Sequence, residues 1–325
     1  MYPRRTTAAL MVAAAWVAVR APNAQEDGRT VYRVDVDMVM LTFSVTDAKG
    51  KAVTGLTAAD VRIFEDHIPQ KIASFAEGSR PLLEILGRPE SDGTSIFILF
   101  DTSNQMYKTF PYVCDAIAEF IRRLDPVDSV AIYTFSRNLS RAAPLTRDHI
   151  LAKAGLTNAV AGDDTALFNC LLLTLRDAAK VPGRKAVVVF SNGPDNTSMV
   201  APGDVGRVAE DAGIPVYVIS TQEAAKDPML TAALHSLTAR TGGSLYWARN
   251  WQQQSSAFAA VREDIGSSYT ACYYPAPNQN QGFRKLTLEL LPPGARTWRV
   301  RVRAGYQVQK RPSGSTQSVA GNPKN

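Results

Sequence analysis

The sequence predicts an α/β protein: a doubly wound, mostly parallel sheet with an accessory β-sandwich-like unit formed by the N- and C-terminal segments. Two patterns predict this fold. Between residues 94 and 267, short apolar runs alternate with helical patterns, and repeated βα units of this kind form parallel sheets with right-handed crossovers. Residues 31–75 and 268–307 show mainly strand patterns. We expect these two flanking segments to pack together as one unit beside the central domain.

Composition and charge exclude several classes of protein. With 325 residues, of which 45% are apolar and 20% charged, the chain is too apolar to be disordered and long enough for one to three folded domains. The formal net charge of +6 does not indicate a nucleic-acid partner, because the positive charge is concentrated at the two ends of the chain. Residues 25–275 hold 24 basic and 29 acidic residues, whereas residues 276–325 hold nine basic residues against Glu289 alone.

Residues 1–24 predict an export signal. A basic pair precedes an apolar run from Ala8 to Val19, and small residues follow, which is the pattern of a secretory signal peptide that is cleaved after Ala21 or Ala24. A retained N-terminal anchor is the alternative, but the run is shorter than the roughly 20 apolar residues that span a bilayer. No later segment predicts a transmembrane helix. We therefore expect a periplasmic or extracellular protein.

The elements of the N-terminal unit, residues 31–75, follow from alternation and turn residues. Apolar and polar side chains alternate from Val34 to Met38 and, in the opposite phase, from Leu41 to Val45, which predicts a β-bulge near Val39. The four residues from Asp47 have the composition of a hairpin turn. A further strand is predicted at residues 61–64. Residues 76–93 are rich in glycine and proline and predict a linker.

The central domain, residues 94–267, begins with the apolar run 96–100, which is typical of a strand covered on both faces of a parallel sheet. Pro111 opens the first helix. Asp163 and Asp164 are expected to cap a helix over residues 165–180. The further strands are predicted at residues 130–135, 186–190, 216–219 and 244–247.

The C-terminal segment, residues 268–307, ends in a strand on which Arg299, Arg301 and Arg303 share one face. We expect this face to be exposed, either as a solvated surface or in contact with an anionic surface such as lipid headgroups or an acidic polysaccharide. Export and the absence of interleaved aromatic residues argue against nucleic acid. The composition of residues 308–325 predicts a disordered tail.

Three polar loops mark the candidate site, because ligands of open α/β sheets bind beyond the carboxyl ends of the strands. Residues 101–106 follow the first strand of the central domain, residues 162–167 precede a helix, and residues 191–196 follow the strand at 186–190.

These loops resemble those of a von Willebrand factor type A (VWA) domain, which has a Rossmann-like fold. Members of that family carry Asp-x-Ser-x-Ser after the first strand, a threonine before a helix, and an aspartate in a Thr-Asp-Gly segment, and these residues form a metal-ion-dependent adhesion site. The ligand-binding positions that the resemblance implies are Asp101, Ser103, Gln105, Thr165 and Asn192. Gln105 stands in place of a serine and Asn192 in place of the aspartate, so the implied site is degenerate.

Two segments outside these loops resemble one subgroup of the family. Val-Thr-Asp-x-x-Gly-Lys at residues 45–51 and Arg-x-Arg-x-Gly-Tyr at residues 301–306 are similar to an exported, acidobacterial-type VWFA-related subgroup. The resemblance covers residues 31–307, and it implies a fold more than a function.

Two interpretations of the degenerate site stay open. Asp101, Ser103 and Thr165, together with waters, could hold Mg²⁺ or Mn²⁺, because these ions prefer oxygen ligands. The neutral Asn192 would weaken the attraction for a divalent ion. Alternatively, Asp101 and Thr165 cap neighbouring helix N-termini in a metal-free polar cluster.

We expect a non-enzymatic, adhesion-type module that binds an unidentified protein or envelope component through these loops. A metal-free scaffold that binds through the β unit or the arginine strand is the alternative. A hydrolase-like enzyme is a third reading, since Ser191 follows a buried strand, but its turn lacks the G-x-S-x-G glycines and no histidine is placed as its base.

Three cysteines, Cys114, Cys170 and Cys272, are too few for a disulfide framework or a zinc site. Cys114 and Cys170 lie in helical apolar patterns, which favours burial as small hydrophobic side chains. A bridge between these two in an oxidising compartment stays open.

Overall fold

The structure is a computed structural model that describes residues 38–79, 93–106, 110–159, 161–191, 195–221, 224–291 and 295–308. The predicted signal peptide, most of the predicted linker and tail, and Asn192 lie outside the described residues, as does the side chain of Gln105.

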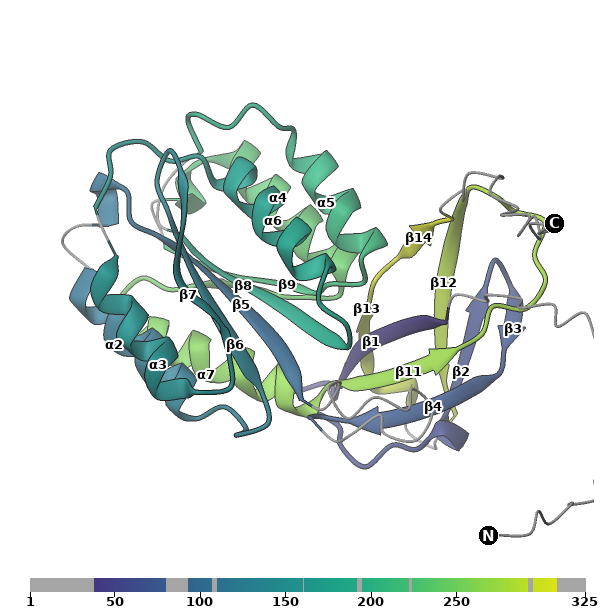
Figure 1. The fold of residues 1–325 in the computed structure, drawn as a ribbon. Helices are drawn as coiled ribbons and strands as arrows, with labels where there is room; N and C mark the ends of the chain where they lie inside the picture. Colours follow the sequence, from purple (N-terminus) through teal and green to yellow (C-terminus); the bar gives the residue numbers. More distant parts are fainter. Residues whose placement is uncertain are drawn as a thin grey trace, which may run out of the picture. The chain divides into compact units, whose positions relative to one another are not determined.

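A six-stranded sheet with the order β10-β9-β8-β5-β6-β7 forms the α/β domain (Figure 1). Its strands are β5 (Thr94–Asp101), β6 (Ser129–Phe135), β7 (Leu139–Thr146), β8 (Arg184–Ser191), β9 (Val216–Ser220) and β10 (Leu245–Trp247). Neighbouring strands are parallel except for β7, which runs antiparallel to β6. The predicted mostly parallel sheet is confirmed.

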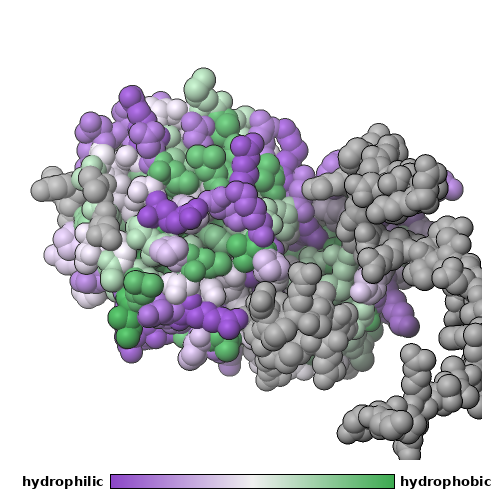
Figure 2. Space-filling view, viewed as in Figure 1, coloured by the Kyte–Doolittle hydropathy of each residue, from purple (hydrophilic) through white to green (hydrophobic). Residues whose placement is uncertain are grey.

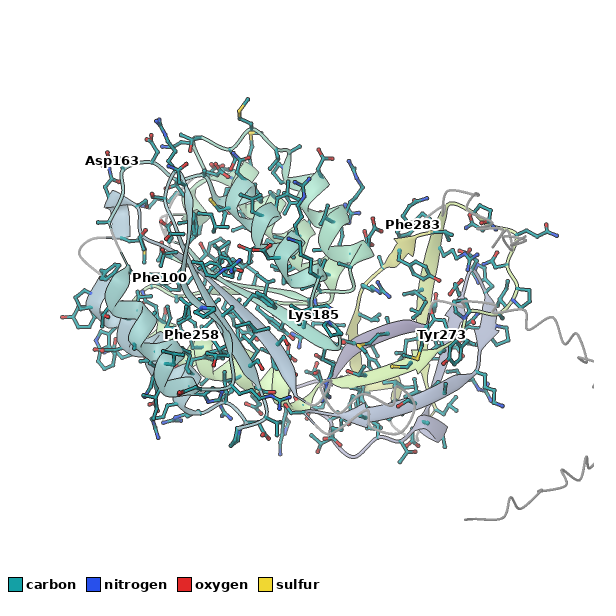
Figure 3. All side chains as sticks on the ribbon, in the orientation of Figure 1. Phe100, Asp163, Lys185, Phe258, Tyr273 and Phe283 are labelled. Atoms are coloured by element: carbon teal, nitrogen blue, oxygen red, sulfur yellow. The ribbon has the colours of Figure 1, made fainter. Side chains whose placement is uncertain are left out.

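Helices cover both faces of this sheet, so it is doubly wound. The α-helices are α2 (Phe110–Arg122), α3 (His149–Ala154), α4 (Leu167–Ala179), α5 (Pro202–Asp211), α6 (Pro228–Thr241) and α7 (Trp251–Ser267), with short 3₁₀ turns at 58–60, 104–106, 155–158, 224–226 and 295–297. Alternate residues of β5 point to opposite faces: Phe100 packs in the core that contains Phe258 of α7 (Figure 3), whereas Leu99 packs in the core that contains Leu171 of α4.

Two four-stranded sheets with the orders β13-β1-β11-β4 and β14-β12-β2-β3 form the β unit. Their strands are β1 (Val39–Thr46), β2 (Val61–Glu65), β3 (Ile68–Gln70), β4 (Ile72–Glu77), β11 (Tyr269–Tyr273), β12 (Phe283–Leu290), β13 (Arg299–Val302) and β14 (Gly305–Gln307). N-terminal β1 lies between C-terminal β11 and β13, and β12 pairs with β2. One hydrophobic core joins the two sheets through residues such as Phe43, Ile63, Tyr269 and Leu286. The accessory sandwich built from both ends of the chain is therefore present.

Three elements differ from the sequence expectation. The edge strand β7 and helix α3 were not predicted; the register of β7 shifts against β6, so its sequence lacks a regular apolar alternation. Strand β4 extends to Glu77, two residues into the predicted linker, because Ala76 is buried and pairs with Thr270 of β11.

The arginine strand also differs, and the expected exposed face is wrong for two of its three residues. Arg299 is exposed, but Arg301 forms an ion pair with Asp264 of α7, and Arg303 is only 6% exposed. The alternation correctly put the arginines on the face of β13 opposite the sandwich core. Because α5, α6 and α7 of the α/β domain pack near that face, it is an internal surface of the protein.

None of the described helices is long and apolar enough to cross a membrane. On the α/β domain as seen in Figure 2, hydrophilic residues lie between smaller hydrophobic areas.

Candidate functional site

The candidate site lies where β5 and β8 end side by side. Strand β5 is paired with β6 on one side and β8 on the other, and the chain crosses to opposite faces of the sheet from this point, which makes it a topological switch point. Asp101 is the last residue of β5 and is fully buried. Its Oδ2 accepts a hydrogen bond of 2.6 Å from the Ser191 hydroxyl at the end of β8, and its Oδ1 accepts one of 2.8 Å from the Ser103 backbone N–H.

The loop before α4 is held directly against the loop after β5. The Gly162 N–H donates to the Thr102 carbonyl at 2.9 Å, and Gly162 forms a parallel bridge with Ser103. On its other side this loop also lies close to the residue after β6, since a Cβ at Gly162 would lie 2.2 Å from Ser136 Oγ, an approach that glycine permits. The sequence therefore places the Thr165 segment beside the Asp101 segment.

Thr165 is buried and is held in place by the third loop. Its N–H donates to Asn196 Oδ1 at 3.1 Å, and its carbonyl accepts from the Asn196 and Thr197 N–H groups at 3.1 and 3.2 Å. The structure places Ser103 against Asp101, and it places the loop that carries Thr165 beside Ser103 through Gly162. The predicted ligand-binding role of these residues stays a prediction.

Asp195, and neither Asp163 nor Asp164, caps helix α4. Asp195 Oδ2 accepts from the Phe168 N–H in the first turn of α4 at 2.9 Å. Asp164 instead pairs with Arg137 at 2.7 Å, and Asp163 is exposed at the end of the sheet remote from Lys185 (Figure 3). The expected cap was wrong because α4 begins at Leu167, too far along the chain for those two carboxylates.

Replacing Asp195 with alanine is expected to lower the free energy of unfolding by about 1–2 kcal/mol, the usual effect of losing a helix cap. Urea denaturation followed by circular dichroism measures the change. Asp163→Ala is the matched control, because that carboxylate is exposed, and it should change stability by less than about 0.5 kcal/mol. Equal losses in both variants would contradict the capping role.

The electrostatics of the site are those of a single buried carboxylate among hydroxyl groups. Burial, together with the nearby negative charges of Asp195 and Asp101, raises the pKa of Cys170 to about 12, so this thiol stays neutral. Cys170 and Cys114 pack in the cores on opposite faces of the sheet, and all three cysteines are free thiols. The bridge that the sequence left open is absent.

Ser103 Oγ is buried and has no hydrogen-bond partner among the described residues. A buried hydroxyl without a partner is uncommon and costs stability unless a ligand or ion completes it. With Asp101 and Thr165 it provides carboxylate and hydroxyl oxygens, the donor type that Mg²⁺ and Mn²⁺ prefer. The described residues contain no cluster of three or more His, Cys, Asp or Glu side chains that could hold a metal. The donors present fit such an ion in type, but with less negative charge than a strong site has.

Exposed large apolar side chains surround this end of the sheet. Parallel strands lead into helix N-termini at their carboxyl ends, so Tyr112 in α2, Met229 in α6 and Trp251 in α7 lie at the same end as Asp101. Met199 lies in the segment between β8 and α5. Met199 is 93% and Met229 is 84% exposed, and the two aromatic residues are about half exposed.

Sequence reasoning missed two functional neighbours, Ser191 as the hydroxyl partner of Asp101 and Asp195 as the cap of α4. Ser191 was considered only as a nucleophile. The signal that could have found its role is its position at the end of a buried strand that neighbours β5 in this sheet order.

Residues 96–194 match the family model of the von Willebrand factor type A domain. The resemblance predicted from the loops is thereby confirmed for this segment. The narrower resemblance to an exported acidobacterial subgroup stays a prediction.

Several solved structures are similar to the chain. BatB from Bacteroides thetaiotaomicron is 20% identical, with 53% of this chain and 97% of that chain covered and a TM-score of 0.46. The vWF domain of the type V pili tip protein Mfa5 from Porphyromonas gingivalis is 10% identical, with 53% and 94% covered and a TM-score of 0.46. A von Willebrand factor type A protein from Catenulispora acidiphila is 12% identical, with 85% and 76% covered and a TM-score of 0.46. Among curated proteins, none matches the chain.

Proposed function

We propose that this VWA-containing chain is an exported, non-enzymatic module that binds a partner protein through the loops at the carboxyl ends of β5 and β8. The partner contributes an acidic side chain to a degenerate adhesion site formed by Asp101, Ser103 and Thr165. Export rests on the signal pattern of residues 1–24. Gln105 and Asn192, the two positions that depart from the family pattern, belong to the same proposed ligand-binding loops.

The observation that carries the proposal is the buried Ser103 hydroxyl without a partner, next to the fully buried carboxylate of Asp101. A buried hydroxyl without a partner beside a buried carboxylate favours a cation, which the hydroxyl oxygen can bind. Ser191 orients the carboxylate by donating to Oδ2, while the Ser103 backbone N–H fixes Oδ1. The site is therefore organised before anything binds.

A divalent cation held by Asp101, Ser103 and Thr165 would supply the positive charge that attracts a partner carboxylate. The protein supplies the rest of the interface. Met199, Met229 and Trp251 offer exposed apolar and aromatic surface at the same end of the sheet, and such residues are enriched where proteins bind one another. A central acidic contact with an apolar surround is an arrangement suited to protein recognition.

Calorimetric titration with Mg²⁺ and with Mn²⁺ tests the metal site. The wild-type protein is expected to bind at least one of the two ions, and Asp101→Ala is expected to weaken that binding at least tenfold, about 1.4 kcal/mol, because the sole buried carboxylate is lost. Ser103→Ala should weaken it less, because it removes a neutral ligand. Asp163→Ala is the control that should leave binding unchanged. Absence of binding to the wild-type protein would refute the metal site.

Capture from the envelope fraction separates the metal-dependent reading from the metal-free scaffold. Under the proposal, Asp101→Ala and Trp251→Ala both reduce capture of the partner, and a chelator has the same effect. If capture survives Asp101→Ala and chelation but is lost with Arg299→Ala, the scaffold reading replaces the proposal.

Among the described residues, no histidine contacts Ser191 as the hydrolase-like alternative would require. The Ser191 hydroxyl donates to Asp101. His149 Nε2 lies 3.0 Å from the Asp128 carbonyl, and His235 packs against Trp247.

A further inference from the structure

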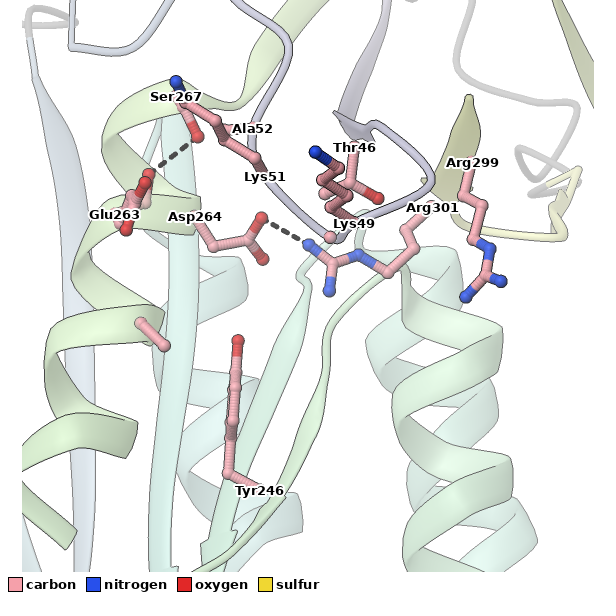
Figure 4. A pocket seen from close by; sticks show the side chains of 12 residues that line it. Thr46, Lys49, Lys51, Ala52, Tyr246, Glu263, Asp264, Ser267, Arg299 and Arg301 are labelled. Atoms are coloured by element: carbon pink, nitrogen blue, oxygen red, sulfur yellow. Dashed lines mark hydrogen bonds and ion pairs between the residues drawn. The ribbon is translucent and has the colours of Figure 1, made fainter. Parts of the chain in front are cut away.

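A groove separate from the Asp101 site runs along the junction between the α/β domain and the β unit. Its first part is a cavity of about 570 Å³ lined by the turn after β1, the C-terminal half of α7 and strands β10 and β13 (Figure 4). The side chains that matter there are Lys49, Lys51, Tyr246, Glu263 and Arg299.

A second cavity of about 560 Å³ continues the groove, because it shares Tyr246 and Arg301 with the first. This second cavity is lined by residues near the end of α6, by β10 and by β13, among them Thr238, Ser244 and Leu245. The two adjoining cavities form one elongated groove, which suits an extended chain more than a compact small molecule.

The floor of the groove is held rigidly. Arg301 reaches from β13 to Asp264 of α7 and to the Ser244 hydroxyl, and Figure 4 shows the ion pair with Asp264. Burial raises the pKa of Tyr246, so its hydroxyl remains a neutral hydrogen-bonding group. A fixed floor lowers the conformational entropy that the protein itself loses when a ligand binds.

Two strand edges line this groove. Among the described strands, β10 pairs only with β9 at the end of the central sheet, and β13 pairs only with β1 at the end of its own sheet. An edge strand presents backbone N–H and C=O groups that can pair with an added strand. An extended peptide in the groove can therefore pair with one of the two edges.

The first cavity, at the turn after β1, carries an excess of positive charge. Lys49, Lys51 and Arg299 are exposed and form no ion pair among the described residues, whereas Arg301 neutralises Asp264. Glu263 is the one remaining carboxylate in the lining of this cavity. The excess of positive charge attracts an acidic ligand.

We infer that this groove docks an extended acidic peptide segment of a partner protein, by strand addition at the edge of β10 or β13 and charge pairing with Lys49, Lys51 and Arg299. The groove is independent of the Asp101 site. Helix α7 begins with Trp251 at the Asp101 end and reaches the groove at Glu263 and Ser267, and its 17 residues span roughly 25 Å.

Fluorescence anisotropy with a labelled peptide of alternating Glu and Val, about ten residues long, tests the inference on the full chain. Binding is expected at low salt and should weaken as salt screens the charges. The double variant Lys51→Glu/Arg299→Glu is expected to weaken it at least tenfold. Lys71→Glu, an exposed lysine next to β4 at the other edge of the sheet, should have little effect.

Two further peptides separate the contribution of backbone pairing from the contribution of charge. The same peptide methylated on alternate backbone amides should bind at least fivefold more weakly if strand addition occurs, and a matched Gln-Val peptide should bind weakly because it lacks charge. Asp101→Ala should leave peptide binding unchanged, so failure here is distinguishable from failure of the metal site. Equal binding of the Gln-Val peptide, no effect of the double variant, or binding of phosphatidylglycerol vesicles without peptide binding would overturn the inference.

Discussion

Replacing Arg303 with methionine is expected to lower the free energy of unfolding by about 3 kcal/mol. The guanidinium donates to the Glu210 and Asp211 carbonyls at 3.0 and 3.3 Å, and to the Met40 carbonyl at 3.2 Å. Methionine retains much of the apolar stem but leaves buried acceptors without a donor, and each such loss costs roughly 1–3 kcal/mol.

Arg303 has this effect because it joins three elements. Glu210 and Asp211 end α5, where helix carbonyls lack intrahelical partners, and a cation there also interacts favourably with the helix dipole. Met40 belongs to β1. One side chain therefore ties the α/β domain to the β unit.

Urea denaturation measures the loss, with Arg299→Met, at the start of β13, as the matched control. Arg299 is exposed and forms no ion pair with the residues that the structure describes, so its replacement should change stability by less than about 0.5 kcal/mol. If the two methionine variants unfold at the same urea concentration, Arg303 does not stabilise the contact between the α/β domain and the β unit.

Replacing Arg284 with methionine is expected to cost about 3–5 kcal/mol, the range for removing one partner of a buried ion pair. Arg284 Nη1 lies 2.6 Å from Glu65 Oε1, and Glu65 is fully buried inside the β unit. The Tyr273 and Tyr306 hydroxyls also donate to this carboxylate, at 3.1 and 2.9 Å. Burial and the charge of Glu65 raise the pKa of Tyr306 to about 12, so its hydroxyl keeps its proton at neutral pH.

A double-mutant cycle tests the pair. Arg284→Met leaves a buried negative charge with two neutral donors, whereas Arg284→Met/Glu65→Gln removes the charge as well. The double variant is expected to be more stable than the single variant by at least about 1 kcal/mol, because replacing both ions is less costly than leaving one unpaired. A double variant less stable than the single one would show that Glu65 contributes mainly through the tyrosines.

The α/β domain could be predicted closely because its strands are covered on both faces. Continuous apolar runs such as residues 96–100 and 186–190 have few alternatives to a buried parallel strand, and both are strands in the structure. The edge strand β7 was missed because its register shifts against β6 and only Ala143 in it is fully buried, so its sequence shows no regular alternation.

The sequence predicted which loops form the candidate site, but not which side chains contact one another there. Strand ends place Asp101 and Ser103 together, but the cap of α4 comes from Asp195, which lies beyond β8 in the sequence. Local spacing favoured Asp163 and Asp164, since a capping residue usually precedes its helix directly. Only the fold shows which loop supplies it.

The arginines of β13 illustrate a second limit. Alternation tells which residues face away from the core of their own sheet, but not whether another domain covers that side. Arg303 looked solvated in the sequence and is buried in the structure. Burial of a polar side chain between two domains produces no apolar periodicity in the sequence of either domain.

The central position of β1 has a consequence for the order of folding. Phe43 pairs with Tyr269 and also with Val302, so both partners of this strand emerge more than 200 residues later in synthesis. Such pairings have high contact order, and closing so long a loop is entropically costly when the intervening chain is unfolded. The α/β domain, whose contacts are nearer in sequence, reduces that cost once it has folded. Once folded, this domain holds the two halves of the β unit close enough to pair with each other.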